Sequence, residues 1–221
     1  MFNLEKEVNI AIDGPVASGK TTVGKQLSER LGFDFLDTGL FYRAVTWAVL
    51  IGNSNLNLLE DPRVFVENME LDIKDSKVWA FGQDITHQLR SAAVEKEVSD
   101  ISAIPEVRRV LVDTQRITAQ NRRVVMVGRD IGTVVLPRAN YKFFLEASVN
   151  VRVKRRHNEM KSDGIEQNVH ELESEIVIRD SVDTNREDSP LSMAEDAILI
   201  NTDDMTVSEV VDNMVLRISS G

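Results

Sequence analysis

The glycine-rich loop at residues 14–21 constrains the fold of this chain more than any other stretch. It follows an apolar run at residues 8–13, which predicts a buried strand. An amphipathic pattern after it predicts a helix from about residue 20 to residue 31. The pattern G-x-x-x-x-G-K-[ST] is matched at all of its fixed positions, Gly14, Gly19, Lys20 and Thr21.

A loop of this kind between a strand and a helix binds phosphate. Glycines let successive backbone N–H groups turn toward the phosphate oxygens, and the helix N-terminus adds unpaired amides and a favourable dipole. Lys20 then reaches the terminal phosphates of a nucleoside triphosphate, and the Thr21 hydroxyl holds Mg²⁺. The alternative is an ordinary glycine turn, but the complete match in this context favours the phosphate site. The expected triphosphate-binding residues are Gly14, Pro15, Val16, Ala17, Ser18, Gly19, Lys20, Thr21 and Thr22.

Composition and charge exclude several other classes. The 221 residues are 42% hydrophobic and 28% charged, as in a globular protein, and no apolar run approaches the roughly 20 residues that span a bilayer. The first residues lack the layout of a signal peptide, and the absence of cysteine excludes disulfides. We therefore expect a cytoplasmic protein. A net charge of −10 argues against nucleic acid and membrane surfaces as partners, because both are polyanions.

Apolar runs that alternate with amphipathic stretches predict an α/β fold, a doubly wound parallel sheet flanked by helices. The expected strands are 8–13, 33–36, 124–127, 142–146 and 197–202. The expected helices are 20–31, 44–50, 91–101, 106–120, 149–161, 168–181 and one that starts at the capping box Thr206–Glu209. Residues 71–85 predict an antiparallel hairpin or small sheet inserted into this core.

Ligands of such sheets bind at the carboxyl ends of the strands. Four notable stretches fall there: the glycine loop, Asp37–Arg43, Gly128–Asp130 and Asn201–Asp204.

Four motifs in this chain, in order and at compatible spacing, resemble those of bacterial cytidylate kinases. They are Ile12–Pro15 with the glycine loop, Asp37–Arg43, Gly128–Val135, and the pattern R-D-x-x-D-x-x-R at Arg179–Arg186. The segment at 71–86 corresponds to an insert that these enzymes carry. The resemblance implies a P-loop nucleoside monophosphate kinase that transfers the γ-phosphoryl group of Mg²⁺-ATP to CMP or dCMP.

The same resemblance implies one kinase domain over residues 1–221, divided into regions. Its core would be 8–36 and 122–221, and its acceptor-binding region about 37–121, with the β insert at about 63–90. A short lid would lie at about 152–166. We see no obvious seam for a second subunit and expect a monomer.

The chemistry of such a transfer needs cations rather than a general base, because the acceptor phosphate is already ionised near neutral pH. Arginine suits this task, since its planar fork binds phosphate oxygens in pairs and keeps its charge when desolvated. The resemblance implies the catalytic residues Lys20, Arg129, Arg155, Arg156 and Arg186. Lys20 and the cluster Lys154–Arg156 would contact ATP, with Arg152 as a weaker candidate. A solvated basic helix face is the alternative interpretation of residues 152–156.

The resemblance also implies how the acceptor is held. The expected CMP-binding residues are Thr38, Tyr42, Arg43, Ser99, Arg108, Arg129, Asp130, Arg179, Asp183 and Arg186. Asp130 would accept a hydrogen bond from the exocyclic amine of cytosine, and Arg108 would donate to its acceptor edge. Arg179 and Asp183 would contact the sugar. For Arg43 and Arg129, a surface ion pair is the alternative.

Several points stay open at this level. Asp13 either orders Mg²⁺-bound water or caps the turn. A kinase for another small acceptor, such as UMP, would keep the phosphate ligands but lack the Arg108–Asp130 pair. A guanine-specific nucleotide switch should carry N-K-x-D, which this sequence lacks. The three histidines, His87, His157 and His170, lack the spacing of metal ligands. We therefore expect no metal other than Mg²⁺.

Overall fold

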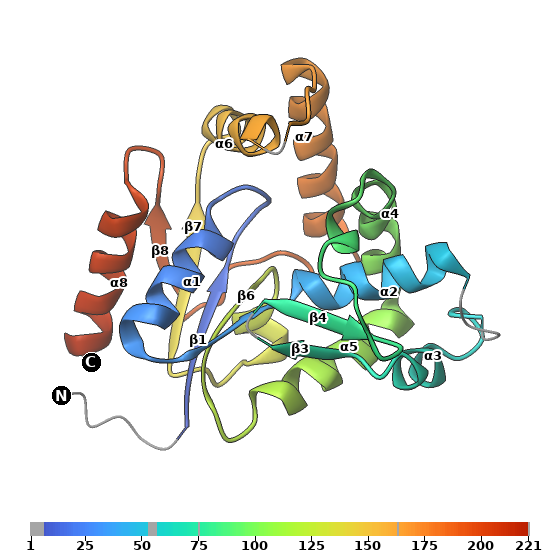
Figure 1. The fold of residues 1–221 in the computed structure, drawn as a ribbon. Helices are drawn as coiled ribbons and strands as arrows, with labels where there is room; N and C mark the ends of the chain where they lie inside the picture. The colour runs from blue at the N-terminus through green and yellow to red at the C-terminus, as the bar shows by residue number, and fades with distance from the viewer. Residues whose placement is uncertain (1–6, 53–56, 75, 163, 221) are drawn as a thin grey trace.

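A five-stranded parallel sheet lies at the centre of the computed structural model, which describes residues 7–52, 57–74, 76–162 and 164–220 (Figure 1). The strand order is β2-β6-β1-β7-β8, with every pair parallel. The strands are β1 (Val8–Asp13), β2 (Asp34–Asp37), β6 (Arg123–Gly128), β7 (Tyr141–Glu146) and β8 (Ile198–Asn201). Each predicted strand is present within one residue of its expected ends.

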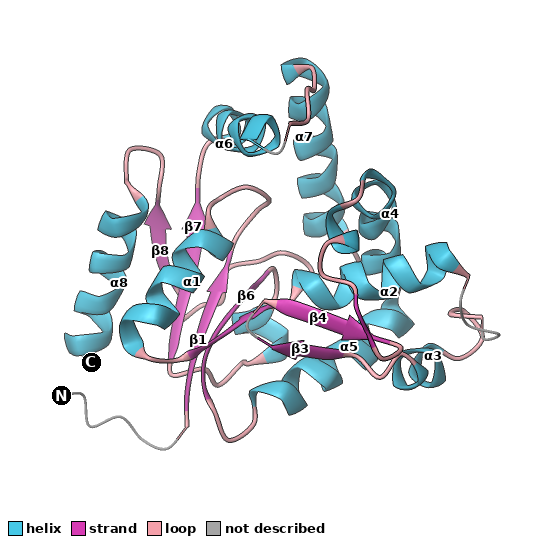
Figure 2. Cartoon of the chain, in the orientation of Figure 1, coloured by secondary structure: helices cyan, strands magenta, loops and turns pink. Residues whose placement is uncertain are grey.

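Helices flank both faces of this sheet (Figure 2). The helices are α1 (Lys20–Leu31), α2 (Gly39–Ile51), α3 (Pro62–Asn68), α4 (Ala92–Ala103), α5 (Pro105–Ala119), α6 (Val149–Ser162), α7 (Val169–Asn185) and α8 (Val207–Ser220). Of these, α6 and α7 lie beyond the carboxyl ends of the strands rather than against a face of the sheet (Figure 1). None of the helices in the described ranges is long and apolar enough to cross a membrane.

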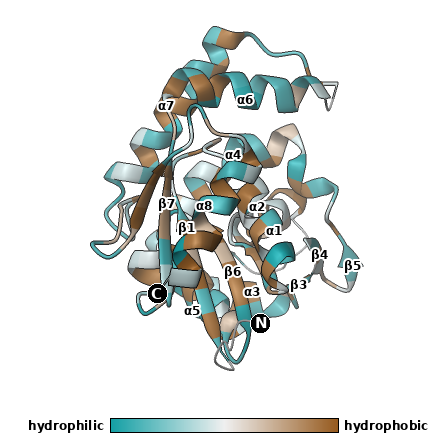
Figure 3. Cartoon of the chain, turned by 90° about the vertical axis from the view of Figure 1, so that its left-hand side faces the viewer, coloured by the Kyte–Doolittle hydropathy of each residue, from teal (hydrophilic) through white to brown (hydrophobic). Residues whose placement is uncertain are grey.

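The central strand β6 shows why the sheet is covered on both sides. Val125 and Val127 pack into a cluster with residues of α1 and α8, whereas Val124 and Met126 pack into a second cluster with residues of α2 and α5. Successive side chains of a strand point to opposite faces, so an uninterrupted apolar run is buried on both. Figure 3 shows the hydrophobic colour along β6 and β7. The predicted doubly wound fold is confirmed.

The predicted insert is a second, antiparallel sheet of three strands, β3 (Asp72–Lys74), β4 (Lys77–Ala80) and β5 (Gln83–Asp84). It lies on the side of the molecule that carries α2 and α3, away from α8 (Figure 1). Val78 and Ile85 from this segment join the cluster that contains Trp47 and Phe65. The insert is therefore packed against α2, the helix that carries Tyr42 and Arg43, and against α3.

Two helix boundaries differ from the prediction by more than two residues. The second helix starts at Gly39 rather than near residue 44, so Tyr42 and Arg43 lie in a helix and not before one. Asp37 causes the early start, because its Oδ1 accepts a hydrogen bond from the Gly39 amide at 2.9 Å. The helix α7 continues beyond residue 181 to Asn185. Three short elements were not predicted: α3, a 3₁₀-helical turn at Gln88–Arg90 and a π-helical turn at Ile131–Val135.

Helix α1 approaches the sheet at Gly24, and this contact gives a test of the packing. A Cβ at Gly24 would lie 2.5 Å from Val127 Cγ1 and 3.0 Å from the ring of Phe35. We expect Gly24→Ala to lower the free energy of unfolding by about 1–3 kcal/mol, as overpacking of a filled core does. Urea unfolding measures this. Lys25→Ala, at an exposed position of the same helix, serves as the control and should change stability by less than about 0.5 kcal/mol. Equal stability of the two variants would contradict the close packing.

Candidate active site

The loop between β1 and α1 has a backbone that its glycines make possible. A Cβ at Gly14 would lie 2.2 Å from the carbonyl oxygen of Leu145. Gly19 has a φ of 95°, in the left-handed region that glycine adopts readily. It precedes α1 without a side-chain cap, so the amides of the first helical turn stay available for an anion. The loop therefore has the geometry of a phosphate cradle.

Lys20 is buried beneath this loop. Its Nζ donates to the Pro15 carbonyl at 2.6 Å and to Ser18 Oγ at 3.3 Å. Burial, and next the charge of Arg129, lower the pKa of Lys20 well below its usual range. An ammonium in such surroundings is stabilised when an anion arrives, so Lys20 is prepared for a phosphate.

Thr21 and Asp37 bring two oxygen groups together at the mouth of the loop. The Thr21 hydroxyl donates to Asp37 Oδ2 at 2.9 Å. Hydroxyl and carboxylate oxygens are suitable ligands for Mg²⁺. Asp37 was not among the expected metal ligands, although its position at the end of β2 is a signal that would have found it.

Asp13 is buried at the end of β1, and both of its oxygens are used. Oδ1 accepts from the Ile131 amide at 2.8 Å, and Oδ2 accepts from the Gly132 amide at 2.7 Å. Burial raises its pKa to about 6, although the two amides act in the opposite direction. Of the two interpretations left open, these contacts support the turn cap.

Arg152 on α6 supports the phosphate loop from outside. It is buried, and its Nη1 donates to the Val16 carbonyl at 3.1 Å and to Asp180 Oδ2 at 2.5 Å. Asp180 Oδ1 in turn accepts from the Val16 amide at 3.3 Å. The interpretation as a solvated face is wrong for Arg152, and its contacts are those of a support rather than of a phosphate ligand. The helical pattern could not distinguish these roles.

The next two arginines of α6 contact different parts of the molecule. Arg155 Nη1 donates to Thr202 Oγ1 at 3.0 Å and to the Ser18 carbonyl at 3.3 Å, so it lies against the phosphate loop. Arg156 extends to Glu95 on α4, with its Nη2 3.3 Å from Oε1. Lys154 is exposed. The predicted cluster is therefore divided between the loop and the acceptor side.

A second group of charges lies on that acceptor side. Arg43 of α2 binds the carboxylate of Glu95 through both of its terminal nitrogens, at 2.8 and 3.2 Å. Arg179 of α7 lies 3.9 Å from the same carboxylate. Arg129, after β6, donates through Nε to Asp183 on α7 at 2.8 Å. Burial lowers the pKa of Arg129, but Asp183 outweighs burial and the net pKa is raised.

A buried ion pair lies beyond these arginines. Arg108 Nη2 is 2.5 Å from Asp130 Oδ2, and both side chains are almost fully buried. Arg108 lies over the ring of Tyr42, 5.2 Å from its centroid, and Arg186 Nη2 is 3.7 Å from Asp130 Oδ1. Burial raises the pKa of Tyr42 to about 12. Three buried polar atoms here have no hydrogen-bond partner, Tyr42 Oη, Arg108 Nε and Arg186 Nη2. Such atoms are where a ligand would bind.

Comparison with known proteins agrees with this arrangement of a phosphate loop and charged clusters. A family model described as Cytidylate kinase matches residues 10–220. The chain belongs to the cytidylate kinase family.

Two curated cytidylate kinases resemble it over nearly their whole length. That of Caldanaerobacter subterraneus subsp. tengcongensis is 45% identical, covering 97% of this chain and 95% of the relative. That of Streptococcus pneumoniae strain 70585 is 43% identical, covering 95% and 96%. The solved structure of an uncharacterized protein from Eubacterium ventriosum has a TM-score of 0.53 at 14% identity, covers 97% of this chain and 100% of that one, and shows the fold alone. The predicted family is confirmed, and with it the class of kinase.

Within this cytidylate kinase family fold, most of the predicted site residues come together. The four stretches expected at strand ends do lie at the carboxyl ends of β1, β2, β6 and β8. For two predicted CMP-binding residues, Thr38 and Ser99, the hydrogen bonds of the described residues give no support, and their roles stay predictions. Thr38 is buried and its hydroxyl donates to the Val127 carbonyl at 2.9 Å. Among the described residues, no hydrogen bond joins the Ser99 hydroxyl to Arg108 or Asp130, and the Ser102 carbonyl accepts from Arg108 instead, at 3.1 Å.

Proposed function

We propose that this kinase transfers the γ-phosphoryl group of ATP to CMP or dCMP, giving ADP and CDP or dCDP. The observation that carries the proposal is the buried Arg108–Asp130 pair, which lies on the same side as the acceptor arginines. A phosphate loop alone fits any triphosphate, whereas this pair is chemically suited to one base.

Asp130 and Arg108 offer the complement of cytosine. A carboxylate oxygen accepts from the exocyclic amine, and a guanidinium donates to the ring nitrogen and carbonyl. In the absence of a base the two groups bind each other, so a bound cytosine would insert between partners that are already in place. Uracil would turn a carbonyl toward Asp130, and two acceptors facing each other discriminate against UMP.

The phosphates would be held by separate groups of cations. We propose that Lys20 and Arg155 hold the ATP phosphates, that Arg43, Arg129 and Arg186 hold the phosphate of CMP, and that Arg156 contacts the transferred group. The acceptor oxygen is ionised, so these residues act by bringing two anions together and stabilising the charge of the transition state. No proton needs to be removed.

Mg²⁺ fits the oxygen groups at the mouth of the loop, where Thr21 and Asp37 lie in contact. Bound with ATP, the ion neutralises part of the charge on the phosphates that take part in the transfer. We propose that the Thr21 hydroxyl binds it and that the Asp37 carboxylate orients that hydroxyl or shares the ion.

Replacement of Thr21 tests the metal. Thr21→Val keeps the shape and removes the hydroxyl, so we expect a higher Mg²⁺ concentration for half-maximal activity and a kcat lower by about tenfold or more. Thr21→Ser keeps the hydroxyl and should restore both values. Titration of activity with Mg²⁺ at saturating ATP and CMP measures them. Equal Mg²⁺ dependence of all three proteins would contradict the proposed ligand.

The function itself is tested by coupled ADP release with CMP, dCMP, UMP and AMP as acceptors. CMP or dCMP should have the highest kcat/KM. A preference for UMP over CMP would overturn the proposal and favour the alternative, a kinase for another monophosphate.

We propose further that the active unit is a monomer and that it works in the cytoplasm. Its regions would be the core at 8–36 and 122–221, the acceptor-binding region at about 37–121 and the lid at about 152–166. The region boundaries follow from the motifs, and Arg156 of α6 contacting Glu95 of α4 is consistent with a lid that meets the acceptor-binding region.

A further inference from the structure

The carboxylate of Glu95 lies among three guanidinium groups that come from three different helices. Its Oε1 is 2.8 Å from Arg43 Nη1 on α2 and 3.3 Å from Arg156 Nη2 on α6. Its Oε2 is 3.2 Å from Arg43 Nη2 and 3.9 Å from Arg179 Nη1 on α7. No motif in the sequence pointed to Glu95, which lies on a fourth helix, α4.

This arrangement has the geometry of a bound oxyanion. Glu95 occupies the fork of Arg43 with both oxygens, and a guanidinium in a bidentate pair with one carboxylate cannot offer the same two donors to a phosphate. Glu95 is also half-buried, with 26% of its side chain exposed. Burial alone raises the pKa of its carboxyl, but Arg43 and next Arg156 outweigh burial, and the net pKa lies below the usual range. The group is therefore charged at neutral pH.

The arginines need an anion whether or not substrate is present. Burial is the main cause that lowers the pKa of Arg179 to about 10, and repulsion from Arg129 and Arg43 acts in the same direction. One carboxylate offsets part of this repulsion. A phosphate monoester brings close to two negative charges at neutral pH and three acceptor oxygens, so it offsets more of the repulsion than the carboxylate does.

We propose that Glu95 is a positioning residue that takes the place of the acceptor phosphate in the ligand-free enzyme. It holds Arg43, Arg156 and Arg179 together and withdraws when the phosphate of a nucleoside monophosphate arrives. The inference rests on the proposed function, since it takes Arg43 as a ligand of that phosphate. Because Glu95 occupies both terminal nitrogens of Arg43, which the acceptor phosphate also needs, it weakens the binding of CMP and of inorganic phosphate.

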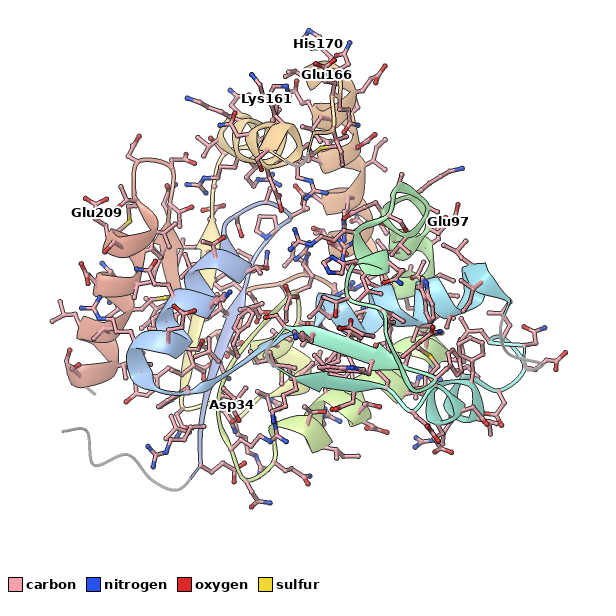
Figure 4. The ribbon with its side chains drawn as sticks, viewed as in Figure 1. Asp34, Glu97, Lys161, Glu166, His170 and Glu209 are labelled. Carbon is pink, nitrogen blue, oxygen red and sulfur yellow. The ribbon has the colours of Figure 1, made fainter. Side chains whose placement is uncertain are left out.

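The test compares Glu95→Gln with Glu97→Gln, which removes the same charge from the same helix. Glu97 lies on the outside of α4 (Figure 4). We expect the Kd of Glu95→Gln for CMP, measured by calorimetry without ATP, to be about two- to fivefold lower than that of the native enzyme, the range expected for loss of one partly exposed ion pair. Inorganic phosphate should also bind more tightly by a similar factor. Glu97→Gln should bind both like the native enzyme.

A merely structural role predicts the opposite sign, because loosened arginines would bind both ligands more weakly. Glu95→Ala is the second variant, since alanine has the highest helix propensity and it also removes the charge. Unchanged or weaker binding of CMP and of inorganic phosphate in the folded variants would overturn the proposal. The titration with inorganic phosphate needs no turnover. If the native enzyme failed to phosphorylate CMP, the proposed function would fail, and this titration would still decide the role of Glu95.

Discussion

We expect Lys20→Ala to lower kcat with CMP and with dCMP alike, by about 10²–10³-fold, because it removes a charge that stabilises the transferring phosphoryl group. The loss should be common to all acceptors, since the hydrogen bonds of Lys20 are to the phosphate loop and not to the Arg108–Asp130 pair. Lys20 also donates to Pro15 and Ser18, so its removal loosens the loop and weakens ATP binding to a smaller degree. Steady-state kinetics at saturating ATP separate the two effects. Lys25→Ala, exposed on the same helix, should leave the rate unchanged.

Removal of the Lys20 charge should raise the stability of the fold, although it lowers activity. Burial lowers the pKa of Lys20 from 10.5, so the unfolded chain binds the proton more tightly than the folded one. This costs folding free energy at neutral pH, and the cost disappears as the pH rises toward 10.5. Lys20→Met, which keeps the volume without the charge, should therefore be more stable than the native chain at pH 7, by a margin that shrinks with rising pH. Chemical unfolding across this range measures it. A less stable variant would mean that the ammonium is a net support of the fold.

The fold could be predicted because its signals are local. Each central strand is an apolar run, and the glycine loop marks where a strand passes into a helix. The start of α2 was placed too late because Gly39 disfavours helix interiors, and only the contact between Asp37 and the Gly39 amide reveals why the helix begins there. The sequence does not predict the turn at Ile131–Val135 for a related reason. It depends on Asp13, which is more than a hundred residues away in the sequence and caps its amides.

The site residues likewise divide into those that local motifs predict and those that only tertiary packing reveals. The residues near a motif, such as Lys20, Arg129 and Asp130, follow from the sequence and a resemblance. Glu95 does not, because its role arises only where four helices meet. Arg152 shows the converse, since its place in a basic run gave no sign that it is buried against Val16 and Asp180. Partners joined by tertiary packing leave no periodic pattern in the sequence.

Asp130→Asn should lower kcat/KM for CMP by about a hundredfold or more while leaving ATP affinity nearly unchanged. Asparagine matches the carboxylate in shape but carries no charge and can present a donor where cytosine also has one. The penalty for UMP should shrink, since the amide can donate to the uracil carbonyl. Kinetics with both acceptors, together with calorimetric titration of ATP, measure the change. An equal loss of CMP turnover and ATP affinity would make Asp130 a structural group or a metal ligand.

The contacts of Asp130 explain why Asn is a better replacement than Ala for this test. Asp130 is the partner of Arg108, and both are almost fully buried. Asp130→Ala would leave that guanidinium without a counterion, which costs about 3–5 kcal/mol and lowers activity by unfolding as well as by loss of recognition. Asparagine keeps a hydrogen-bond acceptor for Arg108 and so limits this cost. Asp113→Asn, which removes an exposed carboxylate from α5, is the matched control and should change neither melting temperature nor specificity. Suppose that CMP selectivity is lost while the melting temperature stays close to that of the native chain. The loss would then be caused by impaired recognition of the base, because misfolding lowers the rate for every acceptor by the same factor.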